Sequence, residues 1–451
     1  MVQTISSAIH AVRQPVSQRS AQPEKRVLIV ALNYTPELVG CAKYTTELAE
    51  DLVARGHVVE VVTAPPYYPA WTIADGYSGA QWTREHIAGV TLHRTPLYVP
   101  ARPTGLKRLI HLSSFGLAAT PTAIAVARRF KPDLVLAIAP TLAAAGAALA
   151  AARVSNARSW LHIQDFEVEA AFDLGLLRSP AALKAALRAE RMLLRAFDRV
   201  SSISPSMVQK LHEKGVPADR TLEFRNWVDV DAVQVFASSN TRYRQELGIG
   251  LDRIVALYSG NMAAKQGIEA LAEVARRLEQ AAAPVTLILC GDGPARAAVH
   301  TACAGLDNVR FLPLQPFERL PELLGTADIH LLPQKAEAAD LVLPSKLTGM
   351  LASGRPVVAM AQPGTGLAAE VDGAGITTDS DAASMTEAIL SLVSDPQRRL
   401  TLGVVARARA EERWRKDAII GGFESALAGL DPARQAASRY PVKRSSASKR
   451  S

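Results

Sequence analysis

The chain has 451 residues, of which 48% are hydrophobic and 21% are charged, with a formal net charge of +8 and a pI near 9.4. This length accommodates two α/β domains, and the composition excludes a disordered or fibrous protein. Much of the positive charge lies near the two ends and no RNA- or DNA-reading motif is present, so we expect an acidic surface rather than a nucleic acid as a partner.

Both ends of the chain differ in composition from its middle. Residues 1–25 are polar, poor in acidic residues and without the apolar stretch of a secretory signal, and residues 431–451 are rich in Ser, Ala, Lys and Arg. Both segments are predicted to be disordered tails. The three cysteines, Cys41, Cys290 and Cys303, are scattered and odd in number, which fits a reducing cytoplasm and predicts no zinc or other metal site.

The first domain is predicted to begin with a strand, a loop, a helix and a second strand. Residues 26–32 (RVLIVAL) form an apolar run typical of a strand buried on both faces, and residues 57–63 repeat it after a helix over 42–55. The loop between the first strand and the helix, NYTPELVGC, contains one glycine, Gly40. Because it lacks a G-x-G-x-x-G fingerprint, we expect no dinucleotide cofactor.

A long loop over 64–82, APPYYPAWTIADGYSGAQW, is crowded with proline and aromatic residues. Loops of this length inside a compact domain usually serve a function. Tyr67, Tyr68 and Trp71 offer an apolar platform with hydrogen-bonding tips for a sugar or polyprenyl acceptor. The alternative is that these rings only close the loop onto its own domain.

Two segments, 109–127 and 134–152, contain no Asp, Glu, Lys or Arg over the length of a membrane span. The second divides into a strand over 134–139, a Pro-Thr turn and an alanine-rich helix, and the first contains His, Ser and Pro, so we expect neither to span a membrane. We expect instead that the first segment contacts a membrane interface. Its flanking bases would meet anionic lipid headgroups: Lys107, Arg108, Arg128 and Arg129.

A strand over 159–165 (SWLHIQD) places His162 and Gln164 on one face and Asp165 at the edge where parallel sheets bind ligands. A basic amphipathic helix and two strands then complete a first domain of residues 26–225. These elements are predicted over 178–197, 199–203 and 221–224.

The second domain, 226–430, repeats the order of strand, small-residue loop and helix. A strand over 254–258 leads through SGNMAAKQG into a helix over 268–281, with Lys265 near its start, and the next strand ends in Gly291-Asp292-Gly293-Pro294. The strands after the first one are predicted over 285–290, 309–312, 329–332 and 356–360. We therefore predict two Rossmann-like, doubly wound parallel sheets facing an interdomain cleft, with the last helices crossing back to the first domain.

The stretch DLVLPSKLTGMLASGRPVVA, residues 340–359, is the most informative part of the second domain. Pro344-Ser345-Lys346 precedes a helix over 347–352, whose first N–H groups have no intrahelical partners. The Ser345 hydroxyl and the Lys346 ammonium at that end match a diphosphate group. The alternative is an ordinary capped helix with a solvated lysine.

These motifs resemble the family 4 glycosyltransferases of GT-B fold, and within that family the WcaI-type enzymes of colanic acid and related exopolysaccharide synthesis. The resemblance covers residues 26–395. It rests on six motifs: NYTPELVG with AKYTTELAEDL, TAPPYYP, LHIQDFEVEA, SGNMAAKQG, CGDGP and LPSKLTGMLASGRPVVA.

The resemblance implies a retaining, metal-independent sugar transfer from a nucleoside-diphosphate sugar. In such enzymes the donor binds mainly to the second domain and the acceptor to the first. Lys265 and Lys346 would then contact the donor diphosphate, and Gly40 would let the first-domain loop approach it. The resemblance further implies donor contacts at Gly260, Asn261, Gly291, Gly293, Leu314, Asp340 and Ser345, and catalytic roles among His162, Gln164 and Asp165.

The chain departs from the family pattern at three places. Gly40 is followed by Cys41 where many members have a second glycine, and Gln164-Asp165 stands where a His-Asp pair is frequent. The paired glutamates of the family are absent, since Gly349 occupies the second place and Asp340 is the acid nearest the first. These departures leave open which first-domain residue assists catalysis.

We therefore expect an enzyme that adds a sugar, from GDP-fucose or else GDP-mannose, to a lipid-linked oligosaccharide. It would need no cofactor and would lie peripherally on the anionic cytoplasmic face of the inner membrane. Two alternatives remain at this point: a sugar-nucleotide epimerase of the same fold, and a non-catalytic assembly partner of a polysaccharide complex.

Overall fold

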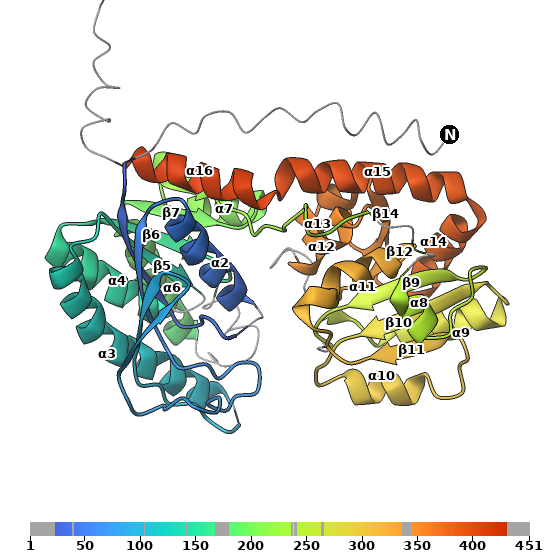
Figure 1. Ribbon diagram of the computed structural model, residues 1–451, viewed down its shortest axis with the longest axis horizontal. Helices are drawn as coiled ribbons and strands as arrows, with labels where there is room; N and C mark the ends of the chain where they lie inside the picture. The colour runs from blue at the N-terminus through green and yellow to red at the C-terminus, as the bar shows by residue number, and fades with distance from the viewer. Residues whose placement is uncertain are drawn as a thin grey trace, which may run out of the picture.

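The computed structural model describes residues 23–430, with gaps at 38–39, 103, 140–141, 167–179, 236–237, 239–240, 263–265 and 336–343. Figure 1 shows two lobes, each built on one sheet, with two helices running along the top of both. The predicted tails (apart from 23–25), Lys265 and Asp340 lie outside the described residues.

The first lobe contains an eight-stranded sheet in the order β3-β4-β2-β1-β5-β6-β7-β8. Every neighbouring pair is parallel except β3 and β4. The strands are β1 (Arg26–Ala31), β2 (Val58–Thr63), β3 (Thr83–Ile87), β4 (Val90–Arg94), β5 (Leu134–Ala139), β6 (Arg158–Ile163), β7 (Arg199–Ser202) and β8 (Thr221–Glu223). The antiparallel hairpin of β3 and β4 corrects the prediction of a purely parallel sheet. Its edge strand TREHI is largely exposed and polar, so it has no apolar run to reveal it.

Helices cover both faces of this sheet and enclose two apolar cores. Gly56, at φ +92°, follows the end of the first helix as a C-terminal glycine should. Helix α3 continues through Pro121 and buries Ala119, Ala123 and Ala127 in one of these cores. The helices are α2 (Cys41–Ala54), α3 (Gly105–Phe130), α4 (Leu142–Ser155), α6 (Pro180–Arg195) and α7 (Pro205–Glu213), followed by the 3-10 turn η2 (Ala218–Arg220).

The second lobe contains a six-stranded, fully parallel sheet in the order β11-β10-β9-β12-β13-β14. Its strands are β9 (Ile254–Ser259), β10 (Val285–Cys290), β11 (Val309–Leu312), β12 (Ile329–Leu332), β13 (Val357–Met360) and β14 (Gly375–Thr378). Three of them, β10, β11 and β12, occupy the predicted residues. The edge strand β14 was not predicted, since GITT is too short and too little apolar to stand out.

Short helices join the strands of the second sheet. They are α8 (Arg242–Glu246), α9 (Ala270–Gln280), α10 (Arg296–Ala302), α11 (Leu320–Thr326), α12 (Lys346–Ala352), α13 (Gly366–Val371) and α14 (Ala382–Ser394), with the 3-10 turn η5 (Phe317–Arg319) before α11. Apolar clusters fill both faces of the sheet. The two predicted doubly wound sheets are therefore confirmed.

Both sheets have a point where the strand order reverses. In the first sheet it lies between β1 and β5, and in the second between β9 and β12. Loops at the carboxyl ends of the strands flanking such a point form the usual ligand site of α/β sheets. Their described residues are 32–37 and 40 in the first lobe and 260–262, 266–269, 333–335 and 344–345 in the second, so the described parts of the predicted motifs lie at the two reversal points.

The carboxyl edges of the two sheets approach one another. A Cβ atom added to Gly366, which follows β13, would lie 3.6 Å from the hydroxyl of Ser206, which follows β7. Nearby, the Arg225 guanidinium donates to the Glu370 carboxylate at 2.7 Å. The two reversal points are thus on sides of the lobes that face each other.

Two helices, α15 (Pro396–Arg413) and α16 (Lys416–Ala428), return the chain from the second lobe to the first (Figure 1). At the crossing, the backbone of Val228 bonds to Trp414 and Lys416 at 2.9 and 3.3 Å. Beyond it, Phe423 packs in the same apolar cluster as Trp160 and Phe224 of the first lobe. The core of the first lobe is therefore completed by the distant helix α16.

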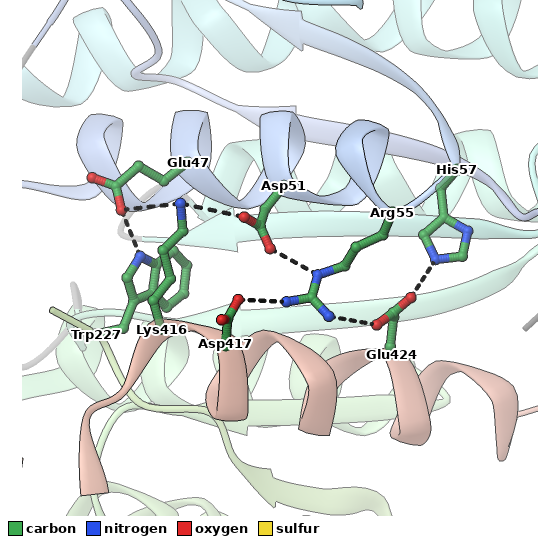
Figure 2. Close-up of polar contacts among 8 residues, drawn as sticks. All are labelled: Glu47, Asp51, Arg55, His57, Trp227, Lys416, Asp417 and Glu424. Carbon is green, nitrogen blue, oxygen red and sulfur yellow. Dashed lines mark hydrogen bonds and ion pairs between the residues drawn. The ribbon is translucent and has the colours of Figure 1, made fainter. Parts of the chain in front are cut away.

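Figure 2 shows the polar contacts that hold α16 against α2. Arg55 is central, since it binds Asp51 of its own helix at 2.8 Å and Asp417 and Glu424 of α16 at 3.2 and 3.0 Å. The His57 ring also contacts Glu424, at 3.0 Å. The side chains of Arg55 and Glu424 are only 8% and 13% exposed, so their ion pair fixes the helix more firmly than a surface ion pair does, whereas Asp417 is 68% exposed and contributes less.

Candidate active site

Lys346 is the cation at the reversal point of the second sheet. Its ammonium donates to the Tyr258 hydroxyl at 2.9 Å and to the Gln266 side-chain oxygen at 2.7 Å, and lies 4.4 Å from the centre of the Tyr258 ring. None of the ion pairs among the described residues includes it. Burial lowers the pKa of Lys346 to about 7, because its neighbours are neutral and solvate the positive form incompletely.

The surface beside Lys346 consists of backbone atoms, because the residues there are glycines without side chains. Gly260 has φ +148°, and a Cβ atom there would lie 3.2 Å from the Lys346 ammonium. Gly291 has φ +140°, and its Cβ atom would lie 1.9 Å from the Gly260 carbonyl oxygen. A Cβ atom at Gly293 would similarly meet the Asn261 side chain at 2.6 Å. The two turns therefore lie against each other in a form that only glycine permits.

The remaining predicted donor residues, apart from Asp340, are described and are exposed. Asn261 and Ser345 are exposed, and the Leu314 side chain is 61% exposed. Ser345 precedes α12, as predicted, but makes no side-chain cap bond, so its hydroxyl is not used by the helix. Because α12 has only seven residues, its dipole adds little, and the positive charge at this end of the helix is that of Lys346 itself.

In the first lobe, Gly40 is exposed and begins α2 with φ +61°. The same loop contains Glu37, a buried carboxylate that sequence reasoning missed. Glu37 accepts hydrogen bonds from the backbone N–H groups of Tyr67 and Tyr68 at 2.7 and 2.8 Å, and from the Asn33 amide at 2.8 Å. Burial raises the pKa of Glu37, although these bonds oppose the rise. The carboxylate thus ties the Gly40 loop to the aromatic loop.

The aromatic platform is only partly accessible. Tyr67 is 6% exposed and packs against Trp71 and His111, with ring centroids 5.5 and 4.7 Å apart. Tyr68 is 37% exposed, Trp71 is half-buried, and Arg108 lies over the Trp71 ring at 5.3 Å. Tyr67 therefore closes the loop onto its own domain, whereas Tyr68 and Trp71 retain surface for a ligand.

His162, at the end of β6, belongs to a buried chain of hydrogen bonds. The Gln164 amide donates to His162 Nε2 at 2.9 Å and to Asn226 at 2.9 Å, so the proton of the neutral ring is on Nδ1 and is donated to Ser201 at 2.9 Å. Burial lowers the pKa of His162 to about 3. The ring therefore stays neutral near pH 7 and orients Gln164, while Asp165 follows as a half-buried residue.

This arrangement suits one kind of ligand. A cation coordinated only by neutral oxygens, beside turns that leave the backbone uncovered, favours an anion with several oxygen atoms, such as a diphosphate. No group of three or more His, Cys, Asp or Glu side chains suited to a metal ion occurs among the described residues.

Family comparisons agree along most of the chain. Residues 39–227 match the Glycosyl transferase 4-like domain, and residues 253–395 match the Glycosyl transferases group 1 family. The putative colanic acid biosynthesis glycosyl transferase WcaI of Escherichia coli (strain K12) is 39% identical over 414 residues, which is 90% of this chain and 100% of that protein. A GDP-mannose-dependent α-(1-6)-phosphatidylinositol monomannoside mannosyltransferase of Mycobacterium tuberculosis (strain H37Rv) is 24% identical over 91% of this chain and 100% of that protein.

Solved structures share the fold. Sucrose-phosphate synthase from Thermosynechococcus elongatus aligns with a TM-score of 0.69 at 19% identity, over 92% of this chain and 100% of that one. Anabaena Alr3699/HepE in complex with UDP-glucose aligns with a TM-score of 0.64 at 20% identity, over 90% of this chain and 100% of that one. The glycosyltransferase WaaG aligns at 0.61. The predicted GT-B fold is thereby confirmed.

Proposed function

Since the chain belongs to the glycosyltransferases with a 4-like first domain and a group 1 second domain, we propose that it takes its sugar from a nucleoside-diphosphate donor, with retention of configuration and without a metal ion. The observation that carries this proposal is Lys346, whose ammonium is bound by Tyr258 and Gln266 beside the glycine turns. Because these partners are neutral, a diphosphate is the group that would compensate its charge.

Transfer makes the departing diphosphate more negative than it is in the bound donor. A cation fixed at that position stabilises the transition state more than the ground state, and so accelerates the reaction. In the free enzyme Lys346 titrates near neutral pH, so an arriving diphosphate would draw a proton onto it. Ser345, Gly260 and Asn261 supply further donors around this group, and Lys265 would be a second cation.

The donor we favour is GDP-linked, GDP-fucose first and GDP-mannose second. The support comes from relatives: the E. coli protein is named for colanic acid biosynthesis, and two mycobacterial relatives are named as GDP-mannose-dependent. Leu314, Gly291 and Gly293 border the donor turns and would contact the base and ribose. We further propose that the enzyme serves a colanic-acid-like exopolysaccharide.

The acceptor we propose is a lipid-linked oligosaccharide bound at the first lobe, on the cytoplasmic face of the inner membrane. Tyr68 and Trp71 have exposed ring surface, and Glu37 connects their loop to the Gly40 loop. A sugar resting on these rings would therefore be held in fixed register with the loop that approaches the donor. His162 is a positioning residue in this scheme, since it orients Gln164, both ring nitrogens are hydrogen-bonded within the protein, and the ring takes up no second proton near pH 7.

A thermal-shift screen of the purified full-length chain tests the donor. GDP, UDP, ADP and their sugars are added in turn, and a ligand that binds the native state must raise the melting temperature. We expect the largest shift with a GDP species, and no shift with that species in a Lys346→Met variant. Product configuration from an NMR spectrum, and unchanged turnover in EDTA, test retention and metal independence. A shift that survives in Lys346→Met contradicts the diphosphate assignment.

A further inference from the structure

The first half of α3 carries large apolar side chains that are mostly exposed in the described structure. The exposed fractions are 71% for Leu106, 58% for Leu109, 47% for Ile110 and 78% for Leu117. These positions recur at helical spacing and form one stripe along the helix. Tyr98, 44% exposed, is held beside the stripe by Ser114 and His111, which bond its backbone at 3.0 and 2.6 Å.

The second half of α3 behaves differently. Ala119, Ala123, Val126 and Phe130 are buried in a core of the first lobe. Although α3 has the length and hydropathy of a membrane span, its exposed apolar stripe ends at Leu117. Twelve helical residues extend about 18 Å, short of the roughly 30 Å hydrocarbon core of a bilayer. The stripe is therefore suited to lie on a membrane and not to cross it.

The charged residues along and around α3 are all basic. Arg102, Lys107 and Arg108 are exposed around the apolar stripe, and no Asp or Glu occurs between Glu85 and Asp133. At the far end of α3, by contrast, Arg129 donates to the buried Glu60 carboxylate at 2.6 Å. The Arg129 side chain is 52% exposed, but the Glu60 carboxylate already compensates its charge. Arg128 and Lys131 at the far end are also exposed, so exposed bases are present at both ends of α3, but the exposed leucines occur only at its beginning.

This end of α3 also touches the aromatic loop. Arg108 lies over the Trp71 ring at 5.3 Å, and the His111 ring lies 4.7 Å from Tyr67 and 5.2 Å from Trp71. A partner surface that contacts the apolar stripe of α3 would therefore lie close to the aromatic loop that carries Tyr68 and Trp71.

We propose that Tyr98, Arg102, Leu106, Lys107, Arg108, Leu109, Ile110 and Leu117, together the docking face, bind the surface of an anionic lipid bilayer. The leucines enter the interface while the bases contact headgroups. Docking holds the aromatic loop at the lipid surface, so that a lipid-linked acceptor reaches Tyr68 and Trp71 without leaving the bilayer. This last step rests on the proposed function, whereas the binding itself does not.

Vesicle sedimentation of the full-length chain tests the docking face. We use vesicles of phosphatidylcholine alone and with one quarter phosphatidylglycerol, and expect binding to the second kind that weakens in high salt. Leu106→Gln/Leu109→Gln/Leu117→Gln should weaken this binding at least tenfold. Arg102→Gln and Lys107→Gln should each weaken it about fivefold. The matched control is Leu251→Gln in the second lobe, a leucine 77% exposed, which should bind as the wild type does.

Further measurements on the triple variant and the wild type decide the outcome. The triple variant should keep its melting temperature and its GDP thermal shift, because the three leucines are exposed and distant from Lys346 in the second lobe. Undiminished vesicle binding by the triple variant overturns the proposal. A dimer in solution that the triple variant converts to a monomer also overturns it, since the face would then bind a second copy. If vesicles bind but no nucleotide shifts the melting temperature, the docking face stands and the proposed transfer is wrong.

Discussion

Lys346, half-buried, and His162, fully buried, are both titratable groups at the carboxyl edges of their sheets, yet loss of solvent has different consequences for them. Burial lowers the pKa of Lys346 to about 7, and its ammonium is held by two neutral oxygens beside open backbone. Burial lowers the pKa of His162 to about 3, and both ring nitrogens are already hydrogen-bonded within the protein. Lys346 can still take up a proton when an anion binds, so it is available for catalysis. The His162 ring stays neutral and hydrogen-bonded within the protein, so its role is structural.

Removing the Lys346 ammonium is the strongest test of this contrast. In Lys346→Met, we expect kcat/KM to fall about a thousandfold, or about 4 kcal/mol, because a fixed charge at a developing anion supplies this much. The melting temperature should stay level or rise, since a partly desolvated cation is gone. Kinetics and a thermal melt on the same preparation measure both. Turnover within a few fold of the wild type would contradict the assignment.

The second prediction concerns the glycine turns beside Lys346. Gly291→Ala should cost about 3 kcal/mol of folding free energy, because its Cβ atom would meet the Gly260 carbonyl oxygen at 1.9 Å in a backbone region that disfavours side chains. The control is Gly305→Ala, also at positive φ but in open space, which should cost about 1 kcal/mol. Urea unfolding compares the two. Equal losses would show that the contact between the turns is not what requires glycine.

The third prediction addresses the His162 side of the contrast. His162→Gln should lower the free energy of unfolding by about 2 kcal/mol, because it leaves buried partners unpaired. The matched control is His330→Gln in the second lobe, whose ring is likewise buried and bonded to Ser353 at 2.9 Å. Both variants should lose stability, and transfer should fall less than tenfold in His162→Gln. A loss of transfer comparable with that of Lys346→Met would make His162 a catalytic residue.

The sign of the His162 effect with pH follows from its pKa. The pKa is about 6.5 in the unfolded chain and about 3 in the folded chain. The neutral ring therefore supports folding above pH 6.5, and this support is lost as the pH falls from 6.5 towards 3. The stability difference between wild type and His162→Gln should shrink over that interval in urea unfolding experiments.

The smallest expected effect is the pH dependence of donor binding. If the charged form of Lys346 binds the diphosphate, GDP-mannose should bind about tenfold more weakly at pH 8 than at pH 6, because only about one tenth of a group with a pKa near 7 is protonated at pH 8. Calorimetry in two buffers of different ionisation enthalpy should show proton uptake at pH 8. Lys346→Met should lose this pH dependence, and its persistence would assign it to another group.

The sequence predicted the parts of this molecule that are local. Continuous apolar runs such as 285–290 and 309–312 are strands at the predicted residues, and Lys346 follows Ser345 at a helix start as the proline and serine indicated. The GT-B fold followed from the alternation of strands and helices together with the family motifs.

The contacts that give the site its character were beyond such reasoning. Tyr258 and Gln266 meet Lys346 across 88 and 80 residues of chain, and no local pattern records that approach. Glu37 was missed because an acidic residue in a loop is expected to face solvent. Its burial depends on the aromatic loop, whose backbone N–H groups donate to it. Burial of Tyr67 was likewise decided by α3, through His111, and not by the composition of the loop itself.

The way α16 returns to the first lobe has a consequence for how the protein comes into being. Glu424 meets His57 across 367 residues of chain, and Phe423 fills a place next to Trp160. During synthesis, the part of the first-lobe core that α16 covers remains exposed. The first lobe therefore cannot finish folding until nearly all of the polypeptide has been synthesised. An expression fragment that stops after β8 would therefore expose an apolar surface and would be a poor substitute for the complete first lobe.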